Sequence, residues 1–104
     1  MRAIQNTAFG DPVETLKLVD LPEPANPGPD EVLIAMEYAP INGNDLAVIT
    51  NRFVYSTPLP SIVGNEGVGR VLQVGSNVSN VKVGDRVLPP LYALTWRERL
   101  VPLC

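Results

Sequence analysis

The sequence predicts a mainly β domain, a small barrel or sandwich with one or two short helices. Several short apolar segments are separated by turn signals such as Gly75-Ser76-Asn77, a pattern typical of small all-β domains. Proline accounts for 11 of the 104 residues, whereas it makes up about 5% of an average protein. Because proline breaks helices and removes ladder hydrogen bonds, this density favours short strands joined by stiff connections.

The length of 104 residues suits one domain with one modest core over residues 1–104. Hydrophobic residues make up 45% and charged residues 18%, which indicates a folded soluble domain. The net charge is −3 and the cationic residues are scattered, so we expect no nucleic-acid partner. No apolar run approaches the ~20 residues of a membrane span, and no signal peptide is evident. The single cysteine, Cys104, cannot form an internal disulfide, so we expect a cytoplasmic location.

The first half of the chain contains three predicted strands. One lies within residues 1–10, and Thr15–Leu21 alternates apolar and polar side chains as a half-buried strand does. The proline-rich segment 21–30 predicts an extended connector. Glu31–Tyr38 is the next strand, and we expect its core face to include Tyr38.

The second half predicts one helix and further strands. Asn44 is the expected N-cap of a short helix over Asp45–Thr50. Ser61–Val74 predicts one long strand with a bulge or bend. Val81–Val87 resembles a tight corner leading into a strand, and Thr95–Val101 alternates as a strand does.

The segment Gly67-Val68-Gly69 invites comparison with a dinucleotide-binding fingerprint. Leu72 stands where the third glycine of that fingerprint is required, and the segment continues as β rather than opening a helix. The glycines are therefore expected to permit a bulge or a close backbone approach.

The chain contains no histidine, so a histidine triad, a histidine metal cage and a histidine general acid are excluded. The remaining proton donors are the carboxylates and the three tyrosines. Tyr38 fits a core face, and Tyr92 could be structural or functional. Tyr55 lies in the irregular loop 51–60, where functional side chains are common, and is the preferred candidate.

Three polar residues have two interpretations each. Glu66, beside Asn65, is a charge in an apolar segment, and it either lines a cleft or is a partly exposed strand residue. Asn42 and Asp45 either belong to a site or only form a turn and a helix start.

Five segments occur together in one order: Pro40-Ile41-Asn42-Gly43-Asn44-Asp45, Gly64-Asn65-Glu66-Gly67, Val74-Gly75-Ser76-Asn77-Val78, Val83-Gly84-Asp85-Arg86-Val87 and Thr95-Trp96-Arg97. Together they resemble the N-terminal GroES-like domain of medium-chain dehydrogenases/reductases, over nearly the whole chain. The local sequences Gly64-Asn65-Glu66-Gly67 and Thr95-Trp96-Arg97 resemble those of the zinc-free branch, the 2-enoyl thioester reductases and quinone oxidoreductases. The resemblance implies a partly open GroES-like β-barrel.

The resemblance also implies a metal-free site. In zinc-dependent relatives a cysteine stands in place of Asn42 and a histidine in place of Asn65, and carboxamides are poor zinc ligands. The lobe that holds a structural zinc is missing as well. We therefore expect no zinc.

By resemblance, the full-length family transfers hydride from NADPH to an activated double bond or a quinone, both small-molecule substrates. Asn42 and Asp45 would lie near the cofactor, with Asn42 also close to the chemistry. The substrate cleft would be lined by Phe53, Asn65, Glu66 and Trp96. The loop tyrosine that protonates the substrate in enoyl reductases corresponds to Phe53, which cannot donate a proton, so Tyr55 is the candidate substitute.

The family continues with a Rossmann domain, which this sequence lacks. We therefore expect a truncated domain that binds NADPH negligibly and is inactive alone, and whose uncovered sheet edge promotes a homo-oligomer. The alternative function is a stand-alone GroES-like barrel used for assembly, as in co-chaperonins. A long mobile docking loop would favour that alternative, but the loop 51–60 is short and stiffened by proline.

Overall fold

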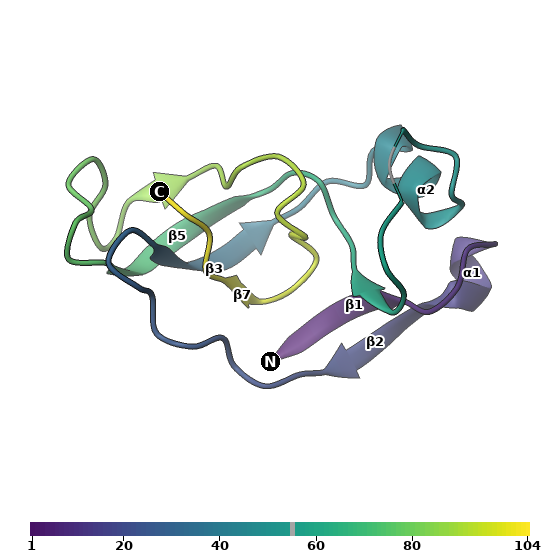
Figure 1. Cartoon of the computed structure of the whole chain (residues 1–104), viewed down its shortest axis with the longest axis horizontal. Coiled ribbons are helices and arrows are strands. Elements are labelled where there is room, and N and C mark those ends of the chain that lie inside the picture. Colours follow the sequence, from purple (N-terminus) through teal and green to yellow (C-terminus); the bar gives the residue numbers. More distant parts are fainter. Residues whose placement is uncertain (55) are drawn as a thin grey trace.

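The computed structural model describes residues 1–54 and 56–104 and shows a mainly β chain with two short helices (Figure 1). The elements follow in the order β1 (Arg2–Asn6), α1 (Pro12–Thr15), β2 (Leu16–Asp20), β3 (Val32–Tyr38), α2 (Gly43–Ile49), β4 (Ser61–Ile62), β5 (Val68–Val74), β6 (Arg86–Val87) and β7 (Arg99–Leu100). Within the described residues, no helix has the length and apolar character needed to cross a membrane. The predicted fold class is confirmed.

The strands form two antiparallel sheets that are open at their edges. One sheet has the order β2-β1-β4, and the other has the order β6-β5-β3-β7. Residues 96–98 connect them, because the Ile4 amide donates to the Trp96 carbonyl at 2.8 Å and the Met36 amide donates to the Glu98 carbonyl at 2.8 Å. The result is a curled, incomplete barrel, as the GroES-like resemblance implies.

The core of the larger sheet lies along β3, which pairs with both β5 and β7. Val32, Ile34 and Leu100 are each no more than 4% exposed and pack together. Gly69 allows this packing: a Cβ atom there would lie 2.4 Å from Ile34 Cγ2 and 2.6 Å from the Ala35 carbonyl oxygen. The expected close backbone approach of the glycine segment is confirmed, and β3 and β5 are also irregular in register.

The core position predicted for Tyr38 is wrong. Its side chain is 78% exposed. The pairing of β3 with β5 shifts register between Met36 and Tyr38, and Tyr38 pairs with Val68 at the start of β5. The end of β3 therefore runs beyond the core.

Both helices differ from the prediction at their N-termini. The N-cap of α2 is Asn42 rather than Asn44, because the Asp45 carboxylate accepts the Asn42 amide in a capping box. Helix α1 was not predicted. The Asp11 side chain accepts the backbone amide of Val13 at 3.1 Å and caps this single helical turn.

The single strand predicted over Ser61–Val74 is wrong, because residues 61–62 and 68–74 belong to different sheets. Gly64, with a φ of 109°, turns the chain between them. The strand predicted over Thr95–Val101 is also shorter, since only β7 forms a ladder and residues 96–98 bridge the sheets. Figure 1 shows β4 beside β1 while β5 continues away from it.

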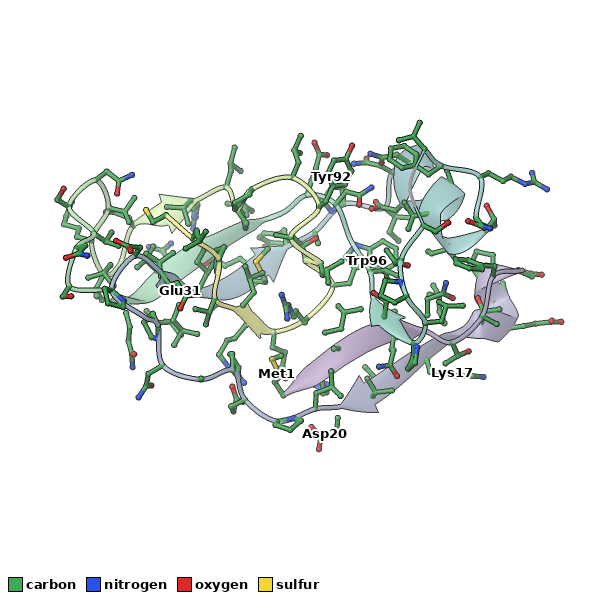
Figure 2. The ribbon with its side chains drawn as sticks, viewed as in Figure 1. Met1, Lys17, Asp20, Glu31, Tyr92 and Trp96 are labelled. Atoms are coloured by element: carbon green, nitrogen blue, oxygen red, sulfur yellow. The ribbon has the colours of Figure 1, made fainter. Side chains whose placement is uncertain are left out.

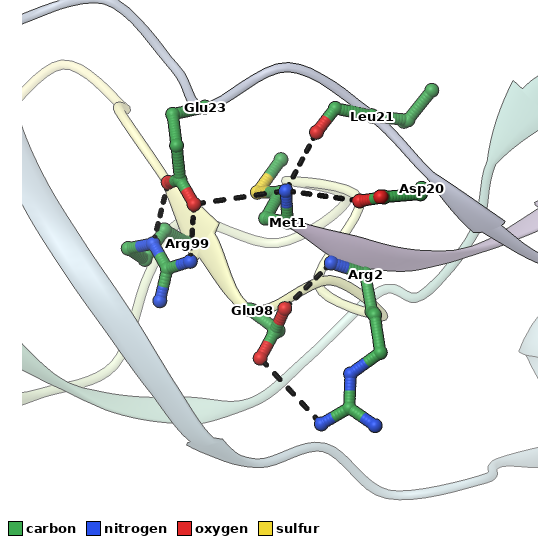
Figure 3. A network of polar contacts seen from close by, with 7 residues as sticks. All are labelled: Met1, Arg2, Asp20, Leu21, Glu23, Glu98 and Arg99. Atoms are coloured by element: carbon green, nitrogen blue, oxygen red, sulfur yellow. Dashed lines mark hydrogen bonds and ion pairs between the residues drawn. The ribbon is translucent and has the colours of Figure 1, made fainter.

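A polar network holds the start of β1 against β7 (Figure 3). The amino group of Met1 donates to the Leu21 carbonyl at 2.6 Å and lies 3.6 Å from a Glu23 carboxylate oxygen. Glu23 in turn accepts the Arg99 guanidinium, with Nε at 2.6 Å. This pairing with Arg99 lowers the pKa of the Glu23 carboxyl below its usual value. The network joins the proline-rich connector to the last strand.

Candidate functional site

The candidate site is a cavity of about 740 Å³ at the end of β3. Such a volume suits a small-molecule ligand. The carboxylate of Glu66 is the charged group among the described residues that line it. The lining residues are Tyr38, Ala39, Pro40, Glu66, Gly67, Val68, Leu88, Pro89 and Leu91. The cavity is therefore an apolar space with one anionic group at its wall.

A buried turn presents Glu66 to this cavity. Val63 and Asn65 are each 3% exposed, whereas Glu66 is exposed. The preceding Gly64 is required by space as well as by its φ, because a Cβ atom there would lie 2.5 Å from Trp96 Cδ1. The turn is thus packed on its inner side and open to solvent on its outer side. Glu66 lines the cavity, which is the first of the two interpretations that the sequence allowed.

Asp45 joins this turn to helix α2. Its side chain is 1% exposed, and its two oxygens accept different backbone amides. Oδ2 accepts the Asn42 amide at 2.8 Å, and Oδ1 accepts the Asn65 amide at 2.9 Å. Both oxygens are occupied, so the geometry gives Asp45 a positioning role between two segments that are 20 residues apart.

Asn42 and Glu66 form a hydrogen-bonded pair in which Glu66 lines the cavity and Asn42 supports it. Asn42 Nδ2 donates to Glu66 Oε2 at 2.7 Å, a short distance typical of a hydrogen bond to a charged acceptor. Asn42 is half-buried and Glu66 is exposed. The amide fixes the carboxylate against the wall, so the structure brings together the two segments that the sequence marked as candidates.

The segment before β7 supports the turn from its other side. Thr95, 1% exposed, donates its hydroxyl to the Glu66 carbonyl at 2.6 Å. The Tyr92 amide donates to the Asn65 carbonyl at 2.8 Å, and the Trp96 amide donates to the Val63 carbonyl at 2.9 Å. Thr95 was not predicted as a site residue, and no local pattern could have revealed this long-range contact.

Two further predicted site residues, Phe53 and Trp96, are not among the described residues that line this cavity. Phe53 packs its ring against Tyr92, with centroids 6.0 Å apart and ring planes at 55°. Trp96 Nε1 donates to the Pro40 carbonyl at 3.3 Å, and its ring lines neighbouring cavities. Tyr55, the predicted proton donor, lies outside the described residues.

The sequence missed the tyrosine that does line the cavity. Tyr38 lies in the wall with its side chain largely exposed, together with the apolar Leu88 and Leu91. The exposure of Leu88 (80%) and Leu91 (62%) beside two prolines makes an apolar rim. The sequence signal for this rim was the pair of leucines on either side of Pro89 and Pro90. Proline has no backbone N–H to donate to a strand ladder, so the prolines argue against a buried central strand at these leucines.

Within residues 1–54 and 56–104, no three His, Cys, Asp or Glu side chains gather to hold a metal ion. For a nicotinamide dinucleotide the fit is partial. Asn65 Nδ2 is buried without a hydrogen-bond partner in the described part of the chain, and such a donor suits an uncharged carbonyl or carboxamide acceptor. None of the described lining residues is cationic, so the phosphates of a dinucleotide have no counter-charge here. The described lining therefore holds no partner for the phosphates of a dinucleotide, and Asn65 is not among the described lining residues.

Comparisons with known proteins agree with this geometry. Residues 28–99 match the family model of the alcohol dehydrogenase GroES-like domain. The mitochondrial enoyl-[acyl-carrier-protein] reductase of Caenorhabditis elegans is 41% identical over 98 residues, which is 93% of this chain and 28% of that protein. The structure of Escherichia coli quinone oxidoreductase complexed with NADPH is 31% identical, with a TM-score of 0.85 over 99% of this chain and 31% of that one.

A third relative is Etr1p in complex with NADP and crotonyl-CoA, 29% identical with a TM-score of 0.86. The match covers 98% of this chain and 31% of that structure. This chain thus spans less than a third of the length of these relatives. The chain belongs to the alcohol dehydrogenase GroES-like domain family, within the medium-chain dehydrogenases/reductases, whose members named here are oxidoreductases.

Proposed function

We propose that this chain forms the substrate-side wall of an NADPH-dependent, zinc-independent reductase that acts on a 2-enoyl thioester or a quinone. The observation that carries the proposal is the carboxylate of Glu66, held by Asn42, in the wall of a large and otherwise apolar cavity. An apolar space with few polar groups at one wall suits an acyl chain or a quinone ring with a polar head. The relatives bind NADP, NADPH and crotonyl-CoA, which supports this choice.

The cofactor would meet this wall through its uncharged end. The carboxamides of Asn42 and Asn65 would face the nicotinamide, while Asp45 holds the backbone that carries both. NADPH supplies a hydride when bound, and this chain's residues orient the acceptor and exclude water. The lack of cationic lining supports negligible NADPH binding by the chain alone, because the phosphates need partners elsewhere.

The proton that completes the reduction needs a donor of this chain or of another segment. Tyr55 is the donor proposed from the sequence, and Tyr38 is a second candidate because it lines the cavity. Phe53 cannot serve. Tyr38→Phe and Tyr55→Phe, made separately in an active enzyme, distinguish the two: the true donor's loss lowers turnover, whereas its neighbour's loss does not.

Self-association through a sheet edge is part of the proposal. Strand β2 lies at the edge of its sheet and carries Leu18 with 66% of its side chain exposed. Such an edge offers unpaired backbone groups to another chain. Sedimentation of the chain at several concentrations should show a species larger than the monomer, and a monomer at all concentrations would contradict this part.

The function is tested in a chimera. Residues 1–104 replace the matching segment of the C. elegans enoyl-[acyl-carrier-protein] reductase, and NADPH oxidation is followed with crotonyl-CoA and with a quinone. We expect turnover of at least one substrate well above that of the 104-residue chain alone. A folded chimera that binds NADPH and reduces neither substrate would contradict the proposal.

A further inference from the structure

We propose that a second cavity, bordered by β1, β3 and residues 95–98, binds a small organic carboxylate with an apolar chain, and that Arg97 holds its carboxylate. This cavity has a volume of about 290 Å³. It shares Ile4, Leu18 and Trp96 with a neighbouring apolar cavity of about 430 Å³. The second cavity shares Tyr38 and Ala39 with the candidate site, but neither Glu66 nor Asn42 lines it. The carboxylate site rests on Arg97 alone, so the inference does not rest on the proposed reductase function.

Arg97 is a half-buried cation without an anion. Its Nη2 donates to the Ala93 carbonyl at 3.1 Å, and this is the one hydrogen bond of the guanidinium to the described part of the chain. Its Nε is buried and has no partner among the same residues. Burial lowers the pKa of Arg97, and no neighbouring carboxylate opposes that effect. A partly desolvated charge of this kind is unfavourable, and an anion that approaches the guanidinium from the cavity would lower that cost.

The two acidic residues that line this cavity are already engaged. Glu37 lies 3.0 Å from Arg86 Nε and 3.6 Å from Arg70 Nε. Glu98 accepts the backbone amide of Arg2 and lies 3.7 Å from its guanidinium. Both carboxylates are paired with other arginines, so neither neutralises the charge of Arg97, and an external carboxylate could do so.

The rest of the surface determines what the carboxylate is attached to. The neighbouring cavity is lined mainly by apolar side chains, including Leu16, Leu18, Ile41 and Trp96. Leu18 and Ile41 are 66% and 75% exposed, so their apolar surface is available to a ligand. Small-molecule pockets have volumes of roughly 300–1,000 Å³, and guanidinium groups bind carboxylates through two parallel hydrogen bonds. An apolar chain that ends in a carboxylate therefore matches both the apolar cavity and Arg97.

Trp96, labelled in Figure 2, makes the proposal directly testable. It is the only tryptophan of the sequence, and it lines both cavities. The 104-residue chain is titrated with octanoate while tryptophan fluorescence is recorded, and octan-1-ol and octylamine serve as matched ligands without the carboxylate. We expect a saturable change with octanoate at concentrations about tenfold or more below those needed for octan-1-ol, since a hydrogen-bonded charge adds to the apolar contact. Equal responses to all three would overturn the proposal, and so would binding of an acidic peptide without binding of octanoate.

Variants then locate the carboxylate. Arg97→Gln should weaken octanoate binding about tenfold or more while octan-1-ol binding stays the same. Arg97→Lys keeps the charge and should retain part of the affinity for octanoate. This variant also tests the assignment if Arg97→Gln fails to fold. Arg52→Gln, an exposed arginine outside these cavities, is the control and should change nothing. Octanoate binding that is unchanged in Arg97→Gln would refute the assignment.

Discussion

Replacing Asp45 should separate the positioning role of this residue from an ordinary helix cap. In Asp45→Ala, the amides of Asn42 and Asn65 both lose their charged acceptor in a buried place. Each hydrogen bond to a charged group contributes about 1.5–3 kcal/mol. Because the buried carboxylate also costs desolvation, we expect the lower end for the pair, about 3 kcal/mol of unfolding free energy.

The assay is urea denaturation, with Asp11→Ala as the control. Asp11 is exposed and accepts a single amide at the start of α1, so its loss should cost about 1 kcal/mol or less. With a urea dependence of about 1–3 kcal/mol per molar, a loss of about 3 kcal/mol in Asp45→Ala should lower the midpoint by about 1–3 M. Asp45→Asn keeps one acceptor oxygen but places an NH₂ group opposite the second backbone amide. Its loss of unfolding free energy should therefore be at least half of that in Asp45→Ala. A midpoint for Asp45→Ala no lower than that of Asp11→Ala would refute the reasoning.

Three further predictions concern stability. Gly64→Ala should destabilise the chain by about 1–3 kcal/mol more than Gly84→Ala, measured by urea titration. Both glycines have positive φ values, but a Cβ atom meets side chains within 2.6 Å at Gly64 and nothing within 4 Å at Gly84; equal losses would contradict this. Thr95→Val should cost about 1–3 kcal/mol, because the hydroxyl bond to the turn carbonyl is lost in a buried place; an unchanged urea midpoint would count against it. The pairing with Arg99 lowers the pKa of Glu23 in the folded state. The ion pair therefore contributes fully to the free energy of unfolding above the usual glutamate pKa, and this contribution disappears as the pH falls through the folded-state pKa. Wild type should therefore lose more stability on acidification than Glu23→Gln, and parallel pH profiles would contradict this.

The sequence was sufficient for the features that depend on local patterns. The alternation in Glu31–Tyr38 predicted β3, and the expected continuation of the glycine segment as β structure through Leu72 is confirmed by β5. Gly67 and Gly69 were correctly expected at a close backbone approach, because a Cβ atom at either would clash with β3. These features are decided within a few residues of the chain.

The errors arose where distant segments decide the outcome. Tyr38 continues the apolar alternation but extends beyond the packed part of the sheet, which no local pattern reveals. The role of Asp45 depends on Asn65, 20 residues further along. The break after Ile62 follows from Gly64, whose neighbours in space come from residues 95 and 96.

The most direct test of the proposed site is the turnover of the chimera with Glu66→Gln. Glu66 is exposed and its backbone is held by Thr95, so the urea midpoint of the variant should equal that of the parent. Crotonyl-CoA or quinone reduction should nevertheless fall about tenfold or more, since the fixed carboxylate at the cavity wall is lost. Turnover within twofold of the parent, in a chimera of unchanged stability, would show that the Asn42–Glu66 pair has no part in the reaction.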